Sequence, residues 1–309
     1  MNSVEMRNLL LAVAGLGLAA LLPFADSGYL LSIGVTIAMY TVLATSWALF
    51  SGPTHYISLA TGAFYGLGTY VVALGIDHMP YPVLLVISLV AGAVAAGLVG
   101  IATLRLSGVY FVIFTLGLAE MIRQVVTWIQ NNWGGHRGLY VLTDITEEII
   151  YWELLALAGI VYVVGWLIGR SRLGFAMRII GNDETVAAHS GINTARAKVL
   201  LFIVSGMVAA LTGALLAPRW TYIEPSLAFS PLLSFQVVIM ALLGGANRLW
   251  GPLVGVIPFT LLWEAISVQF PNQTILLLGV AFLLIVYVIP NGVVGRMEAL
   301  TRTLRERMA

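Results

Sequence analysis

The sequence predicts an all-α polytopic membrane protein, with about ten transmembrane helices in one domain over residues 1–309. The chain is 60% hydrophobic and 9% charged, whereas soluble domains carry about 25% charged residues. Its mean hydropathy is +0.97, and several apolar runs approach or exceed the roughly 20 residues that cross a bilayer as a helix. The runs are continuous rather than alternating, which argues against a β-barrel.

Ten apolar segments are expected to cross the membrane, separated by polar or Gly- and Pro-containing turns. The first follows Arg7 and resembles a signal peptide, but it runs straight into further spans, so we interpret it as retained. Gly92, Ala96 and Gly100 share one face of the fourth segment, as close helix packing in lipid requires. In chain order the segments are 9–25, 29–50, 57–76, 82–104, 110–130, 151–169, 199–217, 232–245, 251–268 and 274–289.

The distribution of basic residues predicts the orientation. With both termini in the cytoplasm, the inner side carries twelve of the fifteen Lys and Arg residues. The other three, Arg123, Arg137 and Arg219, lie outside or in the outer half of the membrane. Cytoplasmic loops of membrane proteins are enriched in Lys and Arg. We therefore expect a multi-pass membrane protein with both termini inside, a cytoplasmic loop at 170–198 and a cytoplasmic tail at 291–309.

The loop 170–198 contains a predicted short helix. Asn182 is placed to cap its first backbone N–H groups, and Asp183 and Glu184 favour the positive end of the helix dipole. Gly191 is placed to end the helix. A short capped helix projecting from the membrane, with little to bury by itself, suggests a docking element; the alternative is an ordinary solvated loop.

The small apolar face of this predicted helix is formed by Val186, Ala187 and Ala188. A partner protein with a groove could receive such a face. A rigid helix pushed by that partner would move the spans on either side of the loop.

Ionisable residues within the spans form the second group of candidates. Glu120, Arg123 and Gln124 stand at i, i+3 and i+4, so they share one helix face. Charged groups at membrane depth usually face a cavity or each other. These residues either line a pathway or gate, or form an internal pair that positions the helix. Glu264 has the same two interpretations, as a gate or subunit contact or as a group that reaches toward the interface.

Other features exclude several function classes. Gly244, Gly245, Gly251 and Pro252 are interpreted as a tight hairpin turn rather than a substrate site. No metal or cofactor site is predicted, because the four histidines are scattered and cysteine is absent. The one lysine, Lys198, follows Ala197 rather than glycine, so there is no phosphate-binding loop. The net charge of +1 implies no nucleic-acid partner. The chain is not expected to be an enzyme.

Four blocks resemble the permeases of ABC importers, most closely the branched-chain amino-acid permeases of the LivM type. The blocks are GNDETVAAHSGIN (181–193) with the following ARAKVLLFIVSGMVAALTGAL, VYFVIFTLGLAEMIRQV (109–125), EPSLAFSPLLSFQVVIMALLGGANRLWGPLVG (224–255) and SLATGAFYGLGTY (58–70). The resemblance implies that Asp183, Glu184, Val186, Ala187, Ala188 and Gly191 couple the chain to an ATPase. It also implies a location in the bacterial inner membrane, a related second permease subunit, two cytoplasmic ATPases and an extracytoplasmic solute-binding protein.

Three departures from the family pattern leave the substrate open. Ala60 and Thr61 stand where the family usually has Gly-His. Residues 133–138 read WGGHRG where the family often has Thr-Gly-Gly-x-x-Gly, and residues 290–292 read PNG where it has Pro-Arg-Gly. Branched-chain or related small amino acids are the expected substrates, with urea and short amides as the alternative. A stand-alone ion-coupled transporter is the alternative from another functional class. An intramembrane enzyme is a third alternative, but the sequence contains no recognisable set of catalytic residues for it.

Overall fold

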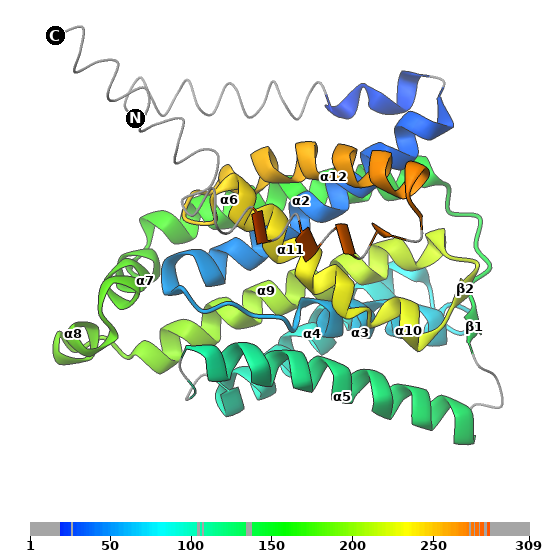
Figure 1. Ribbon diagram of the computed structural model, residues 1–309. Coiled ribbons are helices and arrows are strands. Elements are labelled where there is room, and N and C mark those ends of the chain that lie inside the picture. Colours follow the sequence, from blue (N-terminus) through cyan, green and yellow to red (C-terminus); the bar gives the residue numbers. More distant parts are fainter. Residues whose placement is uncertain are drawn as a thin grey trace, which may run out of the picture.

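The protein is a bundle of membrane-length helices with two short helices projecting at one end (Figure 1). The computed structural model describes residues 19–25, 27–103, 106, 108–133, 138–271, 273–274, 276–277, 279–280 and 283–284. The elements are η1 (Leu22–Ala25), α2 (Gly28–Thr54), α3 (Thr61–Gly75), α4 (Tyr81–Thr103), α5 (Val109–Trp133), β1 (Leu139–Tyr140), α6 (Glu147–Arg170), α7 (Arg172–Asn182), α8 (Glu184–His189), α9 (Thr194–Leu216), η2 (Ala217–Arg219), β2 (Tyr222–Ile223), α10 (Pro225–Ala228), α11 (Pro231–Gly244) and α12 (Gly251–Gln269).

The polytopic helical architecture predicted from the sequence is confirmed. Within the described ranges, seven helical stretches are long and apolar enough to cross a membrane: α2, α4, α5, α6, α9, α10 with α11, and α12. Helix α3 has 15 residues, which corresponds to about 22 Å of helix and is shorter than the ~30 Å hydrocarbon core. The predicted spans 9–25 and 274–289 lie largely outside the described residues, and the predicted tail 291–309 lies entirely outside them.

Helix α9 packs against α3 and α4 through small residues. A Cβ atom on Gly68 of α3 would lie 1.7 Å from the carbonyl oxygen of Ala210, and one on Gly213 of α9 would lie 2.0 Å from that of Tyr65. On α4, a Cβ on Gly92 would lie 2.5 Å from the Cβ of Ala210. Close backbone approach of this kind is how helices associate in lipid, so the predicted packing role of Gly92 is confirmed.

The third predicted span begins later than expected, because residues 55–60 enter the bundle in a non-helical conformation. Non-helical backbone at membrane depth is tolerated only where protein satisfies its polar groups. The Trp47 indole donates to the carbonyl of Ser58 at 2.8 Å. The Leu59 N–H donates to the Thr115 hydroxyl at 3.1 Å. Helix α3 therefore starts at Thr61, where Gly62 N–H donates to the hydroxyl of Ser234 at 2.8 Å.

A two-stranded ribbon was not expected in this all-α fold. Strands β1 and β2 pair antiparallel, with Leu139 opposite Ile223 and Tyr140 opposite Tyr222. They join the α5–α6 connection to the segment before α10, at the end of the bundle opposite α7 and α8 (Figure 1). Two-residue strands carry too few side chains for an alternating pattern to be visible in the sequence.

Candidate functional site

The loop 170–198 forms two helices rather than one. Helix α7 was not predicted; the hydroxyl of Ser171 caps it by accepting from the N–H of Gly174 at 3.4 Å. Its other end lies against the end of α2, where a Cβ on Gly181 would stand 1.9 Å from the carbonyl oxygen of Pro53. Helices α7 and α8 together form the projection at one end of the bundle (Figure 1).

The short helix predicted around Asp183–Ser190 is present, but Asp183 caps it and Asn182 does not. Asp183 Oδ1 accepts from the N–H of Thr185 at 2.7 Å and from that of Val186 at 3.2 Å. These backbone hydrogen bonds, from Val186 and then Thr185, lower the pKa of the Asp183 carboxyl. Asn182 cannot serve because it is the last residue of α7, whereas Asp183 has the extended backbone that an N-cap requires.

The end of α8 matches the prediction. Gly191 adopts φ +80°, in the left-handed region that glycine tolerates without strain. Its N–H donates to the carbonyl of Ala188 at 3.0 Å, and the N–H of Ile192 donates to that of Ala187 at 3.1 Å. The helix therefore ends at His189, and the chain turns back toward α9.

The predicted apolar face of α8 is divided between two sides of the helix. Ala187 is fully buried within the chain, whereas Val186 is 54% exposed and Ala188 is also exposed. Successive residues of an α-helix are about 100° apart, so three consecutive residues cannot share one face. Ala187 holds α8 to the bundle, and Val186 and Ala188 remain accessible.

Glu184 is anchored by Lys198 and Tyr56, neither of which is among the predicted site residues. The Lys198 ammonium donates to Glu184 Oε1 at 2.6 Å, and the Tyr56 hydroxyl donates to Glu184 Oε2 at 3.0 Å. Lys198 Nζ also lies 3.4 Å from the Tyr56 hydroxyl and 4.6 Å from the centroid of its ring. The Lys198 side chain is 3% exposed and that of Glu184 is 40% exposed.

The electrostatics of this cluster follow from its geometry. Burial raises the pKa of Glu184, but the hydrogen bond and charge of Lys198, with the Tyr56 hydroxyl, outweigh burial and lower it overall. Burial is also the main reason that the pKa of Tyr56 is raised. No local spacing rule links residues 56, 184 and 198. The one available signal was that the sole lysine lies near the start of an apolar helix.

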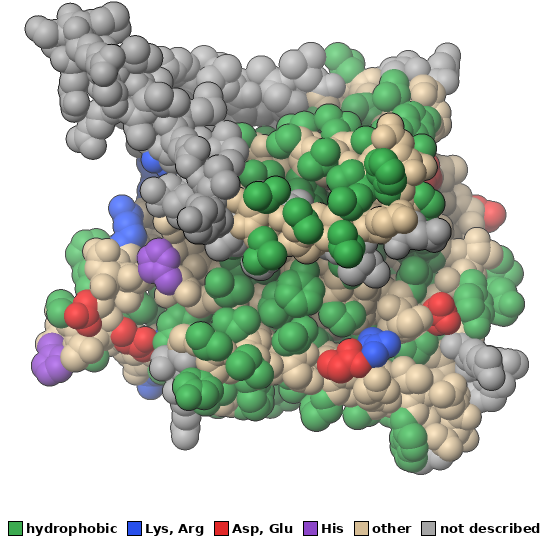
Figure 2. Space-filling model, in the orientation of Figure 1, with side chains coloured by type: hydrophobic (Ala, Val, Ile, Leu, Met, Phe, Trp, Pro, Cys, Tyr) green, Lys and Arg blue, Asp and Glu red, His purple; other side chains and the backbone are tan. Residues whose placement is uncertain are grey.

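Glu120, Arg123 and Gln124 do come together on α5. Arg123 Nε donates to Glu120 Oε2 at 2.8 Å, its Nη2 donates to Glu120 Oε1, and Gln124 Nε2 donates to Glu120 Oε1 at 2.9 Å. The Arg123 and Glu120 side chains are 28% and 39% exposed. Figure 2 shows acidic and basic groups side by side on the largely apolar surface over α5. Their role as pathway, gate or structural pair stays a prediction.

Glu264 lies on α12 and is half-buried. Among the residues that the structure describes, it forms no hydrogen bond or ion pair, and it does not join the Glu120 cluster. The two groups of predicted pathway residues therefore do not form one site within this chain.

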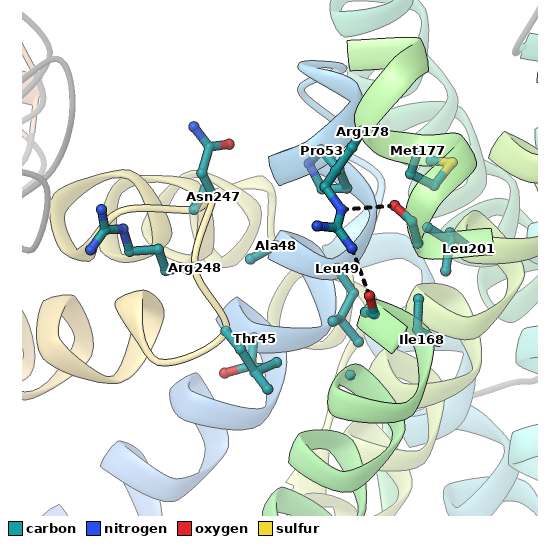
Figure 3. Close-up of a pocket in the computed structure, with 15 residues that line it drawn as sticks. Thr45, Ala48, Leu49, Pro53, Ile168, Met177, Arg178, Leu201, Asn247 and Arg248 are labelled. Carbon is teal, nitrogen blue, oxygen red and sulfur yellow. Dashed lines mark hydrogen bonds between the residues drawn. The ribbon is translucent and has the colours of Figure 1, made fainter. Parts of the chain in front are cut away.

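A cavity of about 350 Å³ lies beside α7, between α2, α6, α9 and the α11–α12 turn (Figure 3). Arg178 of α7 borders it, with Nη2 donating to the Gly169 carbonyl at 2.8 Å and Nε to that of Gly174 at 3.3 Å. The turn is tight, because a Cβ on Gly244 would lie 1.8 Å from the carbonyl oxygen of Gly251. This close approach supports the hairpin interpretation of these glycines. Other lining residues include Thr45, Leu49, Met177, Leu201 and Asn247.

Residues 29–289 match the family model described as "Branched-chain amino acid transport system / permease component". The chain is 26% identical over 318 residues to the high-affinity branched-chain amino acid transport system permease protein LivM of Escherichia coli K12, covering 92% of this chain and 74% of that protein. It is 25% identical over 299 residues to LivH of the same strain, covering 86% and 94%.

A shorter match extends to a sugar transporter. The chain is 27% identical over 142 residues to the ribose import permease protein RbsC of Haemophilus influenzae, covering 44% of each protein. No solved structure matches.

Proposed function

We propose a function from one premise: the chain belongs to the family of permease components of branched-chain amino acid transport systems. It is a multi-pass protein of the bacterial inner membrane and a permease subunit, not an ATPase. The proposed activity is passage of branched-chain or related small amino acids as part of an ATP-driven importer. The family match over residues 29–289 is the observation that carries this proposal.

The proposed partners are a second related permease, two cytoplasmic ABC ATPases and an extracytoplasmic solute-binding protein. Helix α8 is the proposed contact with an ATPase. Asp183 caps it, Glu184 and Ala187 fix it to the bundle, and Gly191 ends it. Val186 and Ala188 stay accessible, as a surface that enters a partner's groove must.

The proposed topology has ten spans in a single domain over residues 1–309, with both termini in the cytoplasm. It rests on the twelve-to-three distribution of basic residues. Leu142, in the α5–α6 connection, and Asn182, at the end of α7, are both exposed. The chain has no cysteine, so Leu142→Cys and Asn182→Cys can be labelled singly. A membrane-impermeant maleimide should reach only Leu142→Cys in intact cells; labelling of both from outside would contradict the topology.

Glu120, Arg123, Gln124 and Glu264 are the proposed pathway or gate residues. The Glu120 cluster supports this because it is only partly buried on the lightly packed helix α5. Polar groups at membrane depth usually face a cavity or protein. A purely structural Glu120–Arg123 pair is the competing proposal.

The substitution Ala188→Glu tests the coupling role of α8. A bulky charge at this exposed position should obstruct the partner's groove. Burying that charge without a counter-charge costs on the order of several kcal/mol. We expect loss of uptake, of solute-stimulated ATP hydrolysis and of ATPase co-purification, with membrane insertion and pairing with the second permease retained. Ala188→Ser is the matched control and should behave as wild type.

Two outcomes would favour the stand-alone ion-coupled transporter instead. One is normal uptake with Ala188→Glu. The other is normal uptake by this chain in vesicles that contain no ATPase. If uptake instead depends on the ATPase, equilibrium binding of a solute panel to the cognate binding protein, including leucine, valine, urea, short amides and ribose, would identify the substrate class.

A further inference from the structure

Lys198 is a buried cation whose main counter-charge belongs to a different helix. It lies on the second turn of α9, and its ammonium reaches Glu184, the first residue of α8, at 2.6 Å. A buried charge is tolerated when it is paired and hydrogen-bonded. Any displacement of α8 that separates the two groups leaves the ammonium unpaired. Helix α8 is therefore tied to the start of α9 by more than the connecting chain.

Tyr56 continues this contact into the bundle. Its hydroxyl contacts both charged groups, and its ring packs against Phe111 in a T-shaped arrangement, at a centroid distance of 5.3 Å and an angle of 80°. Phe111 is fully buried in the first turn of α5. It contacts Phe50 of α2 at 6.1 Å and Phe202 of α9 at 6.2 Å. One tyrosine thus touches both the charged pair that links α8 to α9 and the first turn of α5.

The inner half of α5 has a second contact with the same segment. Leu59 N–H donates to the hydroxyl of Thr115, which lies one helical turn beyond Phe111. Elsewhere α5 packs lightly, because apolar side chains along its length are exposed, among them Ile113 (63%), Met121 (54%) and Trp128 (56%). Residues 55–60 are therefore a major attachment of this half of α5 to the rest of the chain.

We propose that Lys198 and Tyr56 are positioning residues for coupling: the Lys198–Glu184 pair holds α8, and the Tyr56–Phe111 ring contact passes its displacement to the inner half of α5. This inference rests on the proposed function, since it takes α8 as the element that the ATPase moves. It adds a route to α5, the helix that carries Glu120 and Arg123, besides the covalent links of α8 to α7 and α9.

The first experiment measures coupling in the complete complex reconstituted in proteoliposomes, with radiolabelled leucine as the probe. Lys198→Met should leave ATPase co-purification at the wild-type level. It should lower leucine transported per ATP hydrolysed by about fivefold or more, the lower end of ordinary coupling factors. Arg196→Met, which removes a positive charge from an exposed side chain of the same helix, is the matched control and should keep the wild-type ratio. Lys198→Arg should restore most of it.

The second experiment follows α5 directly and needs no substrate. Spin labels at Tyr110→Cys on α5 and Leu262→Cys on α12, both exposed positions, report the distance between the two helices in the complex with cysteine-free partners. ATP should shift this distance in the wild-type background. Tyr56→Phe, which keeps the ring, should preserve the shift, and Tyr56→Leu should remove it.

The outcomes separate the inference from the proposed function. If the wild-type complex recruits no ATPase, the proposed function fails. If the wild-type complex recruits its ATPase but ATP shifts no distance on α5, or Tyr56→Leu leaves the shift intact, the inference fails alone. It also fails if Lys198→Met and Arg196→Met give the same transport ratio, or if Lys198→Met acts only by losing the ATPase.

Discussion

Two ion pairs in this protein each join a carboxylate to a basic side chain, but one forms within a single helix and the other between two helices. Glu120 and Arg123 lie three residues apart on α5, and both side chains are partly exposed. Glu184 and Lys198 lie on two different helices, and the Lys198 side chain is almost entirely buried. The first pair involves only α5 and fixes no other element. The second fixes where one helix stands relative to another.

The difference also lies in what happens when one partner is removed. Without Glu120, the Arg123 side chain is still partly exposed on the surface of α5. Without Glu184, Lys198 stays buried and keeps its contacts with the Tyr56 hydroxyl and ring. A buried pair is costly to break from the side that leaves the buried charge behind.

The largest effect is expected at the long-range pair. Glu184→Gln should lower the free energy of unfolding by about 2 kcal/mol, below the ~3–5 kcal/mol typical of a broken buried pair because Glu184 is partly exposed. Lys198→Met should cost less, because the carboxylate left behind is 40% exposed. Thermal unfolding of the chain in detergent measures both. An equal loss of stability in the two variants would mean that the burial of Lys198 does not determine the cost of breaking the pair.

A smaller effect is expected at the local pair. Glu120→Gln or Arg123→Gln should each cost about 1 kcal/mol or less, as polar contacts within membranes usually do. If the pair is structural, the double variant should recover part of the loss. If the residues line the pathway, transport should fall while thermal stability and assembly persist. Wild-type transport and stability in both single variants would reject both roles.

The smallest effect is a pH dependence that isolates the charge on Glu184. Its pKa is lowered below the ordinary value of 4.5 in the folded chain. The stabilisation is therefore present above about pH 4.5 and is lost as the pH falls through the lowered pKa. The difference in melting temperature between wild type and Glu184→Gln should stay constant from pH 7 to about 5 and shrink below that. A difference that shrinks between pH 7 and 5 would contradict a lowered pKa.

The sequence predicted well wherever the relevant residues are close in the chain. Hydropathy located most of the described spans, and the i, i+3, i+4 spacing placed Glu120, Arg123 and Gln124 together. Cap chemistry also located a helix in the loop 170–198. The cap moved by one residue because α7 runs on through Asn182, and one undivided loop cannot reveal where a first helix ends.

Prediction failed where the decisive contact is long-range. The start of α3 depends on the side chains of Trp47 and Thr115, which satisfy the backbone of residues 55–60. The anchor of α8 depends on Lys198, fourteen residues beyond Glu184. No periodicity or spacing rule contains these distances, since they are set by how the helices pack.

The burial of Lys198 also gives the molecule a chemical reporter. The chain contains one lysine, so one ε-amine records the state of the pair with Glu184. An acylating reagent should react slowly with Lys198 while α8 is in place. The rate of Lys198 acylation, followed by peptide mass spectrometry, would then measure how often Glu184 of α8 separates from Lys198.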